Sequence, residues 1–171
     1  MEWAEGSNPK VVAYYRDAGF PEVKDDAVAW CAAFVGAMIK RAGGKPSGSL
    51  AARSYLKWGK PVALLDAKPG DIVVFRRGNS TWQGHVGFFV SHKGGMIQVL
   101  GGNQRDAVNI APQPVAKLLG VVRGDQEPVK KIPVIDQVVA PEKQNTATSN
   151  QERPSSFWAR IIAALFKGLS K

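Results

Sequence analysis

The sequence predicts an α+β fold in which N-terminal helices pack against an antiparallel sheet. Residues 1–58 contain helix signals, whereas after Pro69-Gly70 the apolar residues come in short runs rich in Val, Ile and Phe. Helices followed by a run of strands are typical of an α+β domain, because a parallel sheet would need the two to alternate. The hydrophobic share of 44% and the charged share of 22% are those of a globular chain.

Two helices are predicted before residue 45. Asn8 is a suitable N-cap and Pro9 a suitable first helical residue, so the first helix is expected to run to about Ala18. The second lies in the segment AVAWCAAFVGAMIKR, with Cys31 in its first turn and Gly43-Gly44 as its stop.

A third helix is predicted from Ser49 to about Trp58. A meander of antiparallel strands then follows, with a tight turn at Gly94-Gly95. The expected strands are Asp71–Phe75, His85–Val90, Met96–Leu100, Ala107–Ile110 and Leu119–Arg123.

The composition divides the chain into three parts. Residues 1–124 form a domain of ordinary size, with 16 Lys or Arg and nine Asp or Glu. Residues 125–156 combine four prolines with many Gln, Asn, Ser and Thr, which predicts a flexible linker. Residues 157–171 are apolar and basic again, which predicts a short terminal helix.

Charge and cysteine content restrict the function. A net charge of +9 favours a polyanionic partner such as nucleic acid, acidic lipid or an anionic cell wall. The basic residues form no recognisable nucleic-acid motif, so we expect no nucleic-acid partner. One cysteine excludes a disulfide framework and a cysteine zinc site, and two histidines leave little room for a metal. We expect no metal and no cofactor.

Cys31 is the candidate nucleophile. At the start of a helix, unpaired backbone amides and the helix dipole favour an anion, so we expect a reactive thiolate there. The same amides are placed to stabilise an oxyanion. The alternative interpretation is a buried structural cysteine on an apolar helix.

His85 and Asn103 complete the candidate site. His85 opens a predicted strand after Gly84, where it is suited to be a general base or is simply a surface histidine. The end of one antiparallel strand lies beside the start of its neighbour, so Asn103 in the segment GGNQ is expected to orient the His85 ring. Gly-Gly-Asn is also ordinary turn chemistry. The order Cys, His, polar residue is typical of papain-like cysteine hydrolases.

Six segments resemble the CHAP/NlpC-like cysteine peptidoglycan hydrolases of bacteria and phages, and the phage endolysins in particular: AWCAAFVGAMIKRAG, SLAARSYLKWG, PGDIVVFRR, GHVGFFVSH, VLGGNQRDAVNI and LGVVRG. The resemblance extends from about Asn8 to Arg123. It implies a compact papain-like fold that cleaves amide bonds of cell-wall peptide. Cys31 would be its nucleophile, His85 its base and Asn103 its polar third residue.

One departure from the family concerns the third residue. Many CHAP members carry a carboxylate two residues before the asparagine, where this chain has Gly101. An acidic orienter is therefore absent unless Asp71 or Asp106 substitutes. The resemblance does not decide between an N-acetylmuramoyl-L-alanine amidase and an endopeptidase, since both use the same catalytic groups.

Aromatic and amide side chains near the motif are candidate substrate contacts. Trp30 precedes Cys31, and Trp82 lies in the loop before His85, so their faces are suited to pack against sugar rings or peptide. Packing in the core is the alternative for both. Gln104, beside Asn103, is expected to contact substrate.

The terminal segment is expected to bind membranes. On a helical wheel, Trp158, Ile161, Ile162, Leu165 and Leu169 share one face, and Arg160, Lys167 and Lys171 lie opposite. That pattern is typical of an interfacial amphipathic helix that binds anionic membrane or outer-membrane lipid. A helix that docks on its own domain is the alternative.

Together these features predict a bacteriolytic, endolysin-like hydrolase of peptidoglycan, acting as a monomer. With no basic and apolar leader after Met1, we expect synthesis in the host cytoplasm and release to the wall. The alternatives are an antibacterial amidase effector and a non-enzymatic wall-binding protein that disrupts membranes.

Overall fold

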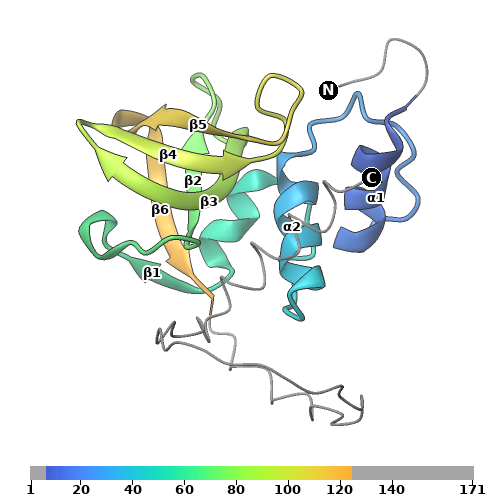
Figure 1. The fold of residues 1–171 in the computed structure, drawn as a ribbon, viewed down its shortest axis with the longest axis horizontal. Coiled ribbons are helices and arrows are strands. Elements are labelled where there is room, and N and C mark those ends of the chain that lie inside the picture. Colours follow the sequence, from blue (N-terminus) through green and yellow to red (C-terminus); the bar gives the residue numbers. More distant parts are fainter. Residues whose placement is uncertain (1–6, 125–171) are drawn as a thin grey trace, which may run out of the picture.

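The computed structural model describes residues 7–124. The predicted linker (125–156) and terminal helix (157–171), with all the expected membrane-binding residues, lie outside the described residues. Two helices, α1 and α2, lie next to each other on one side of a twisted antiparallel sheet (Figure 1). The α+β prediction is confirmed. Within residues 7–124 there is no helix with the length and apolarity needed to cross a membrane.

The two predicted helices begin and end close to the expected residues. Helix α1 spans Pro9–Ala18, with the Asn8 side chain accepting a hydrogen bond from the Lys10 amide (2.9 Å) and Gly19 as a left-handed C-cap (φ 102°). Helix α2 spans Cys31–Arg41, so Cys31 is its first residue.

The predicted third helix is only partly correct. The segment forms a short 3₁₀ helix, η1 (Ala52–Lys57), instead of an α-helix from Ser49. The Ser49 hydroxyl accepts the Ala51 amide (3.1 Å) in a local turn, which delays the helical start, and a strand begins already at Lys60. The resulting helix has only six residues, too few for a stable α-helix.

Within residues 7–124, six strands form one sheet in the order β1-β6-β2-β3-β4-β5. The prediction of a simple meander holds for β2 to β5, whereas β6 returns to pair between β1 and β2, and the short β1 was not predicted. The strand bounds are β1 Lys60–Val62, β2 Ile72–Arg76, β3 Gly84–Lys93, β4 Met96–Gly101, β5 Asn109–Pro114 and β6 Leu118–Arg123. Strand β5 starts two residues later than expected and contains two prolines, which an edge strand tolerates.

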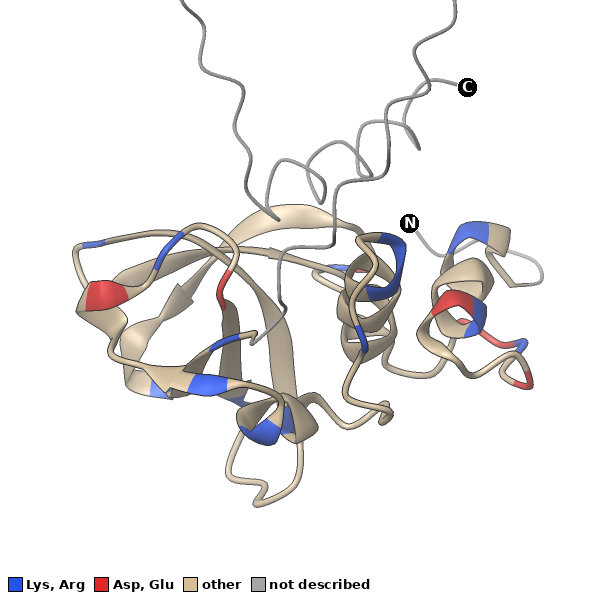
Figure 2. Cartoon of the chain, turned by 90° about the horizontal axis from the view of Figure 1, so that it is seen from below, with Lys and Arg blue, Asp and Glu red and all other residues tan. Residues whose placement is uncertain are grey.

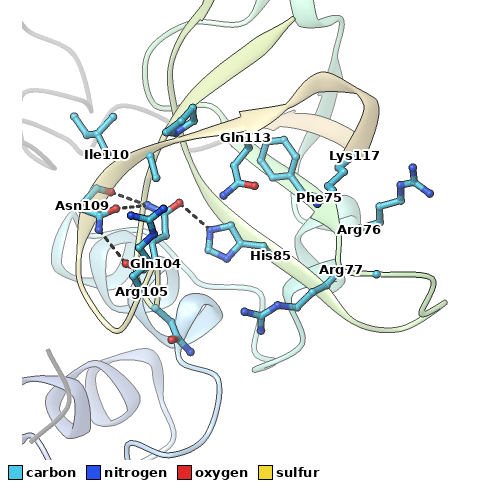
Figure 3. Close-up of a pocket in the computed structure, with 14 residues that line it drawn as sticks. Phe75, Arg76, Arg77, His85, Gln104, Arg105, Asn109, Ile110, Gln113 and Lys117 are labelled. Atoms are coloured by element: carbon cyan, nitrogen blue, oxygen red, sulfur yellow. Dashed lines mark hydrogen bonds between the residues drawn. The ribbon is translucent and has the colours of Figure 1, made fainter.

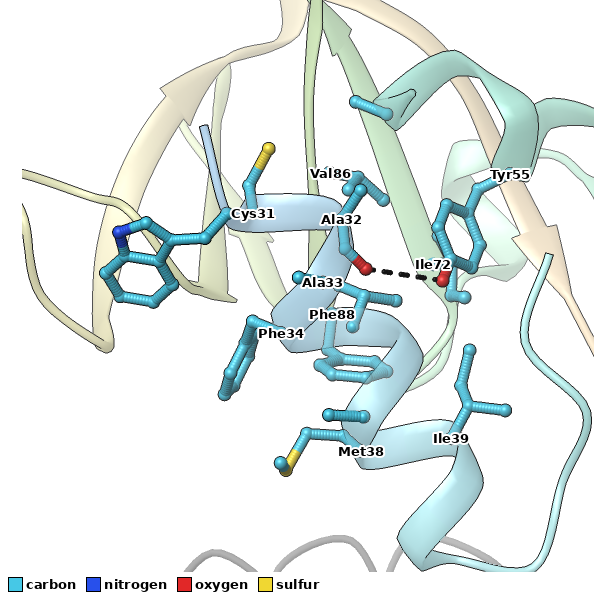
Figure 4. Close-up of a cluster of buried hydrophobic side chains, with 14 of the residues drawn as sticks. Cys31, Ala32, Ala33, Phe34, Met38, Ile39, Tyr55, Ile72, Val86 and Phe88 are labelled. Carbon is cyan, nitrogen blue, oxygen red and sulfur yellow. Dashed lines mark hydrogen bonds between the residues drawn. The ribbon is translucent and has the colours of Figure 1, made fainter. Parts of the chain in front are cut away.

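Both faces of the central strands are buried. Alternate residues of β2 point to opposite sides, so that Ile72 and Val74 join the cluster around α2, and Val73 and Phe75 join a second cluster. Figure 4 shows the first cluster, in which Phe34 and Met38 of α2 lie beside Phe88 of β3. Because α2 is buried along most of its length, its first residue is held rigidly against the sheet.

Charge is distributed unevenly between the two halves of the domain. Figure 2 shows acidic residues around α1 and the loop after it, where residues 17–26 hold four Asp or Glu. Residues 51–124, which form the sheet and its 3₁₀ helices, hold ten Lys or Arg and three Asp or Glu. The sheet half is therefore strongly positive.

Candidate active site

Cys31 lies at the start of α2, facing the beginning of β3. Its side chain is buried (5% exposed), and the backbone amide of Val86, next to His85 in the chain, lies close enough to lower the pKa of the thiol. Figure 4 shows it at the end of α2 that approaches Val86. The prediction that Cys31 lies at a helix start is therefore confirmed.

The pKa of Cys31 departs from the sequence-based expectation. Burial raises the pKa of this thiol above its ordinary value, although the amides of Val86 and Ala32 and the charge of Arg77 act in the opposite direction. The helix start predicts a reactive thiolate at Cys31. In a buried, apolar position the neutral thiol is favoured, so the proton has to leave when the sulfur attacks.

The first turn of α2 supplies free backbone donors. Trp30 is the N-cap and offers no side-chain cap, and Phe34 is the first residue whose amide bonds back, to the Trp30 carbonyl (2.9 Å). The amides of the first turn, including those of Cys31 and Ala32, therefore have no intrahelical partner. They are suited to stabilise negative charge on an oxygen beside Cys31.

His85 lies at the start of β3, opposite Phe75 of β2. The ring is half-buried, and burial lowers the pKa of His85 below its ordinary value; Arg77 lowers it further, and a hydrogen bond to Gln104 raises it. A neutral imidazole is therefore the resting form at neutral pH. Such a ring is suited to accept a proton from Cys31.

Gln104 holds the His85 ring. Its Oε1 lies 3.2 Å from His85 Nε2, while its Nε2 donates to the carbonyl oxygens of Asn109 (2.7 Å) and Val99 (3.2 Å) and to Asn109 Oδ1 (3.0 Å). These acceptors fix which end of the amide faces the ring (Figure 3). Since Oε1 only accepts, His85 Nε2 carries the proton and Nδ1 is left with a lone pair.

Asn103 occupies a different place from the one predicted. Its backbone is left-handed (φ 56°), and its side chain joins the loop to α2: the amide oxygen accepts from the Trp30 backbone amide (3.2 Å) and the nitrogen donates to Asp106 Oδ1 (3.3 Å). The hydrogen bond to His85 that we expected from Asn103 comes from Gln104 instead. The predicted loop does lie beside His85, but its left-handed backbone turns Asn103 away and places Gln104 against the ring.

Gly101 explains how a glutamine reaches the ring. A Cβ at this position would lie 3.2 Å from His85 Nε2 and 3.1 Å from Gln104 Cδ. The Gln104 amide therefore fills the space in which a side chain at position 101 would lie. In the sequence, glycine at position 101 already indicated that the carboxylate common in the family is absent. Only the fold shows that the Gln104 amide takes its place beside His85.

The two tryptophans have different surroundings. Trp30 is 1% exposed and stacks on Tyr14 (centroids 6.0 Å apart), so its face is not available to substrate and the prediction of a substrate contact is not supported. Trp82 is 73% exposed. Its loop is held by Arg53, which donates to the carbonyls of Gln83 (2.8 Å), Ser80 (2.6 Å) and Thr81. Trp82 stays a predicted substrate contact.

Neither aspartate considered as a substitute orienter is bonded to His85. Asp71 is 2% exposed and forms a two-pronged ion pair with Arg123 (2.7 and 2.8 Å) while accepting the Lys68 amide (2.8 Å). Asp106 pairs with Asn103. Asp71 is thus structural and ties β6 to the turn before β2.

A cavity of about 620 Å³ opens beside His85 and Gln104. Its walls come from the ends of β2 and β3, the 103–105 loop and β5. Figure 3 shows His85 and Gln113 directed into it and Arg77 extending along the same side. The space is large enough for a peptide segment.

A buried cysteine at a helix start, a histidine held by an amide at a strand start and an α+β sheet are typical of papain-like cysteine hydrolases. The CHAP domain family matches residues 23–103, so this region is a CHAP domain, a papain-like cysteine amidase/peptidase domain. The protein is thus a cysteine-dependent peptidoglycan amidase or endopeptidase. No curated protein matches the chain. The match includes Cys31 and His85 and ends one residue before Gln104.

The enzyme class and the CHAP resemblance predicted from the sequence are confirmed, and peptidoglycan is the substrate that the domain implies. The phage endolysin type, the domain boundaries, the roles of individual site residues and the membrane-binding tail stay predictions.

Proposed function

We propose that the protein is an endolysin-type lytic enzyme in which Cys31 and His85 cleave an amide bond of cell-wall peptide. The observation that carries this proposal is the His85–Gln104 hydrogen bond beside the Cys31 helix start. It leaves Nδ1 of His85 as the only ring nitrogen free to take a proton. Cys31 and His85 come from adjacent elements, α2 and β3, that share one core cluster.

The reaction begins with both groups neutral. Sγ of Cys31 attacks the substrate carbonyl carbon as its proton moves to Nδ1 of His85, and the first-turn amides of α2 stabilise the oxyanion. The C–N bond breaks as Nδ1 returns that proton to the leaving amine, which gives a thioester on Cys31. Water then attacks the thioester with His85 again as base, and the acid product and the thiol are released.

The two histidines of the chain provide a matched test. His85 and His92 lie on the same strand, and His92 is exposed at its far end, paired with Ile97. We expect His85→Ala and Cys31→Ala to remain folded and to abolish clearing of purified peptidoglycan, and His92→Ala to clear it normally. Clearing by a folded Cys31→Ala protein would contradict the mechanism. Mass spectrometry of the released fragments identifies the amide bond that is cut.

The terminal segment supports a second, finer part of the proposal. Residues 157–171 carry an apolar face and Arg160, Lys167 and Lys171, which suits binding to anionic lipid. Each such charge contributes on the order of 1 kcal/mol near an anionic surface. Purified wall has no bilayer, so neither burial of the apolar face nor attraction to anionic lipid contributes to binding there.

Deletion of residues 157–171 therefore separates wall hydrolysis from membrane action. We expect nearly unchanged hydrolysis of isolated peptidoglycan and sharply weaker killing of intact Gram-negative cells. High salt should reduce killing by the full chain through screening. Loss of activity on isolated wall, with unchanged binding to lipid vesicles, would indicate that the segment belongs to the catalytic domain.

A further inference from the structure

The cavity beside His85 is lined by four basic side chains. Arg76 and Arg77 follow the core residues of β2, Arg105 lies in the loop next to Gln104, and Lys117 lies in η3 (Val115–Lys117). The other polar side chains of the lining are neutral or are His85 itself, and no Asp or Glu takes part. The lining is thus cationic on several sides at once.

Within the described part of the chain, the fold uses none of these cations in an ion pair. Among residues 7–124 the ion pairs of arginine are those of Arg16, Arg41 and Arg123, and none of the four cavity residues is paired with a carboxylate. All four are exposed. Four exposed positive charges around one cavity raise the local positive potential, which favours the binding of an anion there.

Arg77 is the member of this set that acts electrostatically on the proposed catalytic groups. Its charge acts on both Cys31 and His85, which places it within electrostatic reach of the reacting atoms. Figure 3 shows its guanidinium extending beneath the His85 ring, whereas Arg76 points away from it. An anionic group bound by Arg77 would therefore lie close to the scissile bond. Arginine, with its planar fork of donors, is suited to bind a carboxylate with two hydrogen bonds.

We propose that this cavity selects cell-wall peptides that carry a free carboxylate next to the scissile amide, over the same peptides with that carboxylate amidated. The inference rests on the proposed function and names its substrate class. Arg77 and Arg105 make the selective contacts. Arg76 and Lys117 raise the positive potential around them, so that substrate is attracted from further away.

The test compares two muropeptides that differ only by a carboxylate or a carboxamide beside the cleaved bond. We expect kcat/KM of the wild-type protein to be roughly tenfold or more higher for the acid, since a charged hydrogen bond contributes more than a neutral one. Arg77→Gln and Arg105→Gln should each reduce this ratio towards one. Because the ratio compares two substrates of one variant, altered reactivity of Cys31 or His85 cancels.

Lys93→Gln is the matched control. It removes the same charge from the exposed far end of β3 and should leave the ratio unchanged. Arg77→Lys keeps the charge without the fork and should retain part of the preference, which covers the case in which Arg77→Gln does not fold. Binding of both peptides to Cys31→Ala measures the same preference without chemistry.

The outcomes separate the two proposals. Equal kcat/KM for both peptides in the wild type, or a preference retained in both glutamine variants, would overturn the carboxylate inference while leaving the hydrolase intact. Absence of cleavage of either peptide and of purified wall would contradict the proposed function itself.

Discussion

Oε1 of Gln104 lies 3.2 Å from Nε2 of His85, and acceptors from Val99 and Asn109 surround the other end of the Gln104 amide. The glutamine therefore has one orientation and imposes one tautomer on the histidine. A carboxylate in this place would stabilise the charged ring, whereas the neutral amide mainly orients it. This arrangement agrees with a resting site in which burial favours a neutral His85 and a neutral Cys31.

Gln104→Ala tests whether this bond positions the base. We expect kcat to fall by about a hundredfold, since a displaced base loses its alignment with the thiol. The hydrogen bond raises the pKa of His85, so its removal should also move the acid limb of the pH–rate profile to lower pH. A lower rate with an unchanged acid limb would indicate a structural role only.

Gln104→Glu should disturb folding although the two side chains have the same shape. A carboxylate oxygen would replace the donating nitrogen and face the carbonyl oxygens of Val99 and Asn109 without a proton to share. We expect roughly 1–3 kcal/mol of destabilisation at neutral pH, measured by denaturant unfolding. The loss should diminish in acid, where the carboxyl becomes a donor. Equal stability at all pH values would contradict the assigned amide orientation.

The pH dependence of the wild-type protein follows from the two shifted pKa values. Burial, followed by the charge of Arg77, lowers the pKa of His85, so activity should fall in acid only below about pH 6.5. Burial raises the pKa of Cys31 despite Arg77, so the alkaline limb should lie above the ordinary thiol range. Arg77→Gln should move both limbs to higher pH, measured as kcat/KM. A shift of the limbs in opposite directions would contradict this placement of Arg77.

Two adjacent glycines should respond differently to alanine. A Cβ at Gly102 would lie 2.6 Å from both Phe34 Cβ and Trp30 Cζ3, so Gly102→Ala should destabilise the core by about 1–3 kcal/mol. A Cβ at Gly101 would instead meet His85, the proposed base, and Gln104, which holds it. Gly101→Ala should therefore lower kcat strongly and change the melting temperature little. The reverse pattern would exclude Gly101 from the site.

The Arg123–Asp71 pair should contribute stability without affecting catalysis. Arg123→Ala leaves a buried carboxylate with the Lys68 amide as its remaining partner, so we expect about 3 kcal/mol of destabilisation. Arg16→Ala, which breaks the exposed pair with Asp17, is the matched control and should cost less than about 1 kcal/mol. Similar losses of unfolding free energy in the two variants would contradict the inference that burial of Asp71 makes its pair the more stabilising one.

The sequence by itself determined the class of fold, both helices, and the positions of Cys31 at a helix start and His85 near a strand start. Those features are local: Asn8-Pro9 starts a helix, Gly43-Gly44 ends one, and a cysteine at a helix start has a recognisable context. Strand β3 was also predicted, because its apolar run has little alternative to a buried strand.

Only the tertiary structure decided which amide holds His85 and in which direction the pKa of Cys31 is shifted. The left-handed backbone at Asn103 and the space left by Gly101 assign the contact to Gln104, and neither follows from residue spacing. The helix start favours a thiolate, but burial against β3, a long-range contact, opposes it more strongly. Properties set by one segment can be predicted from its residues, whereas those set by desolvation and by the meeting of distant segments depend on how the chain folds.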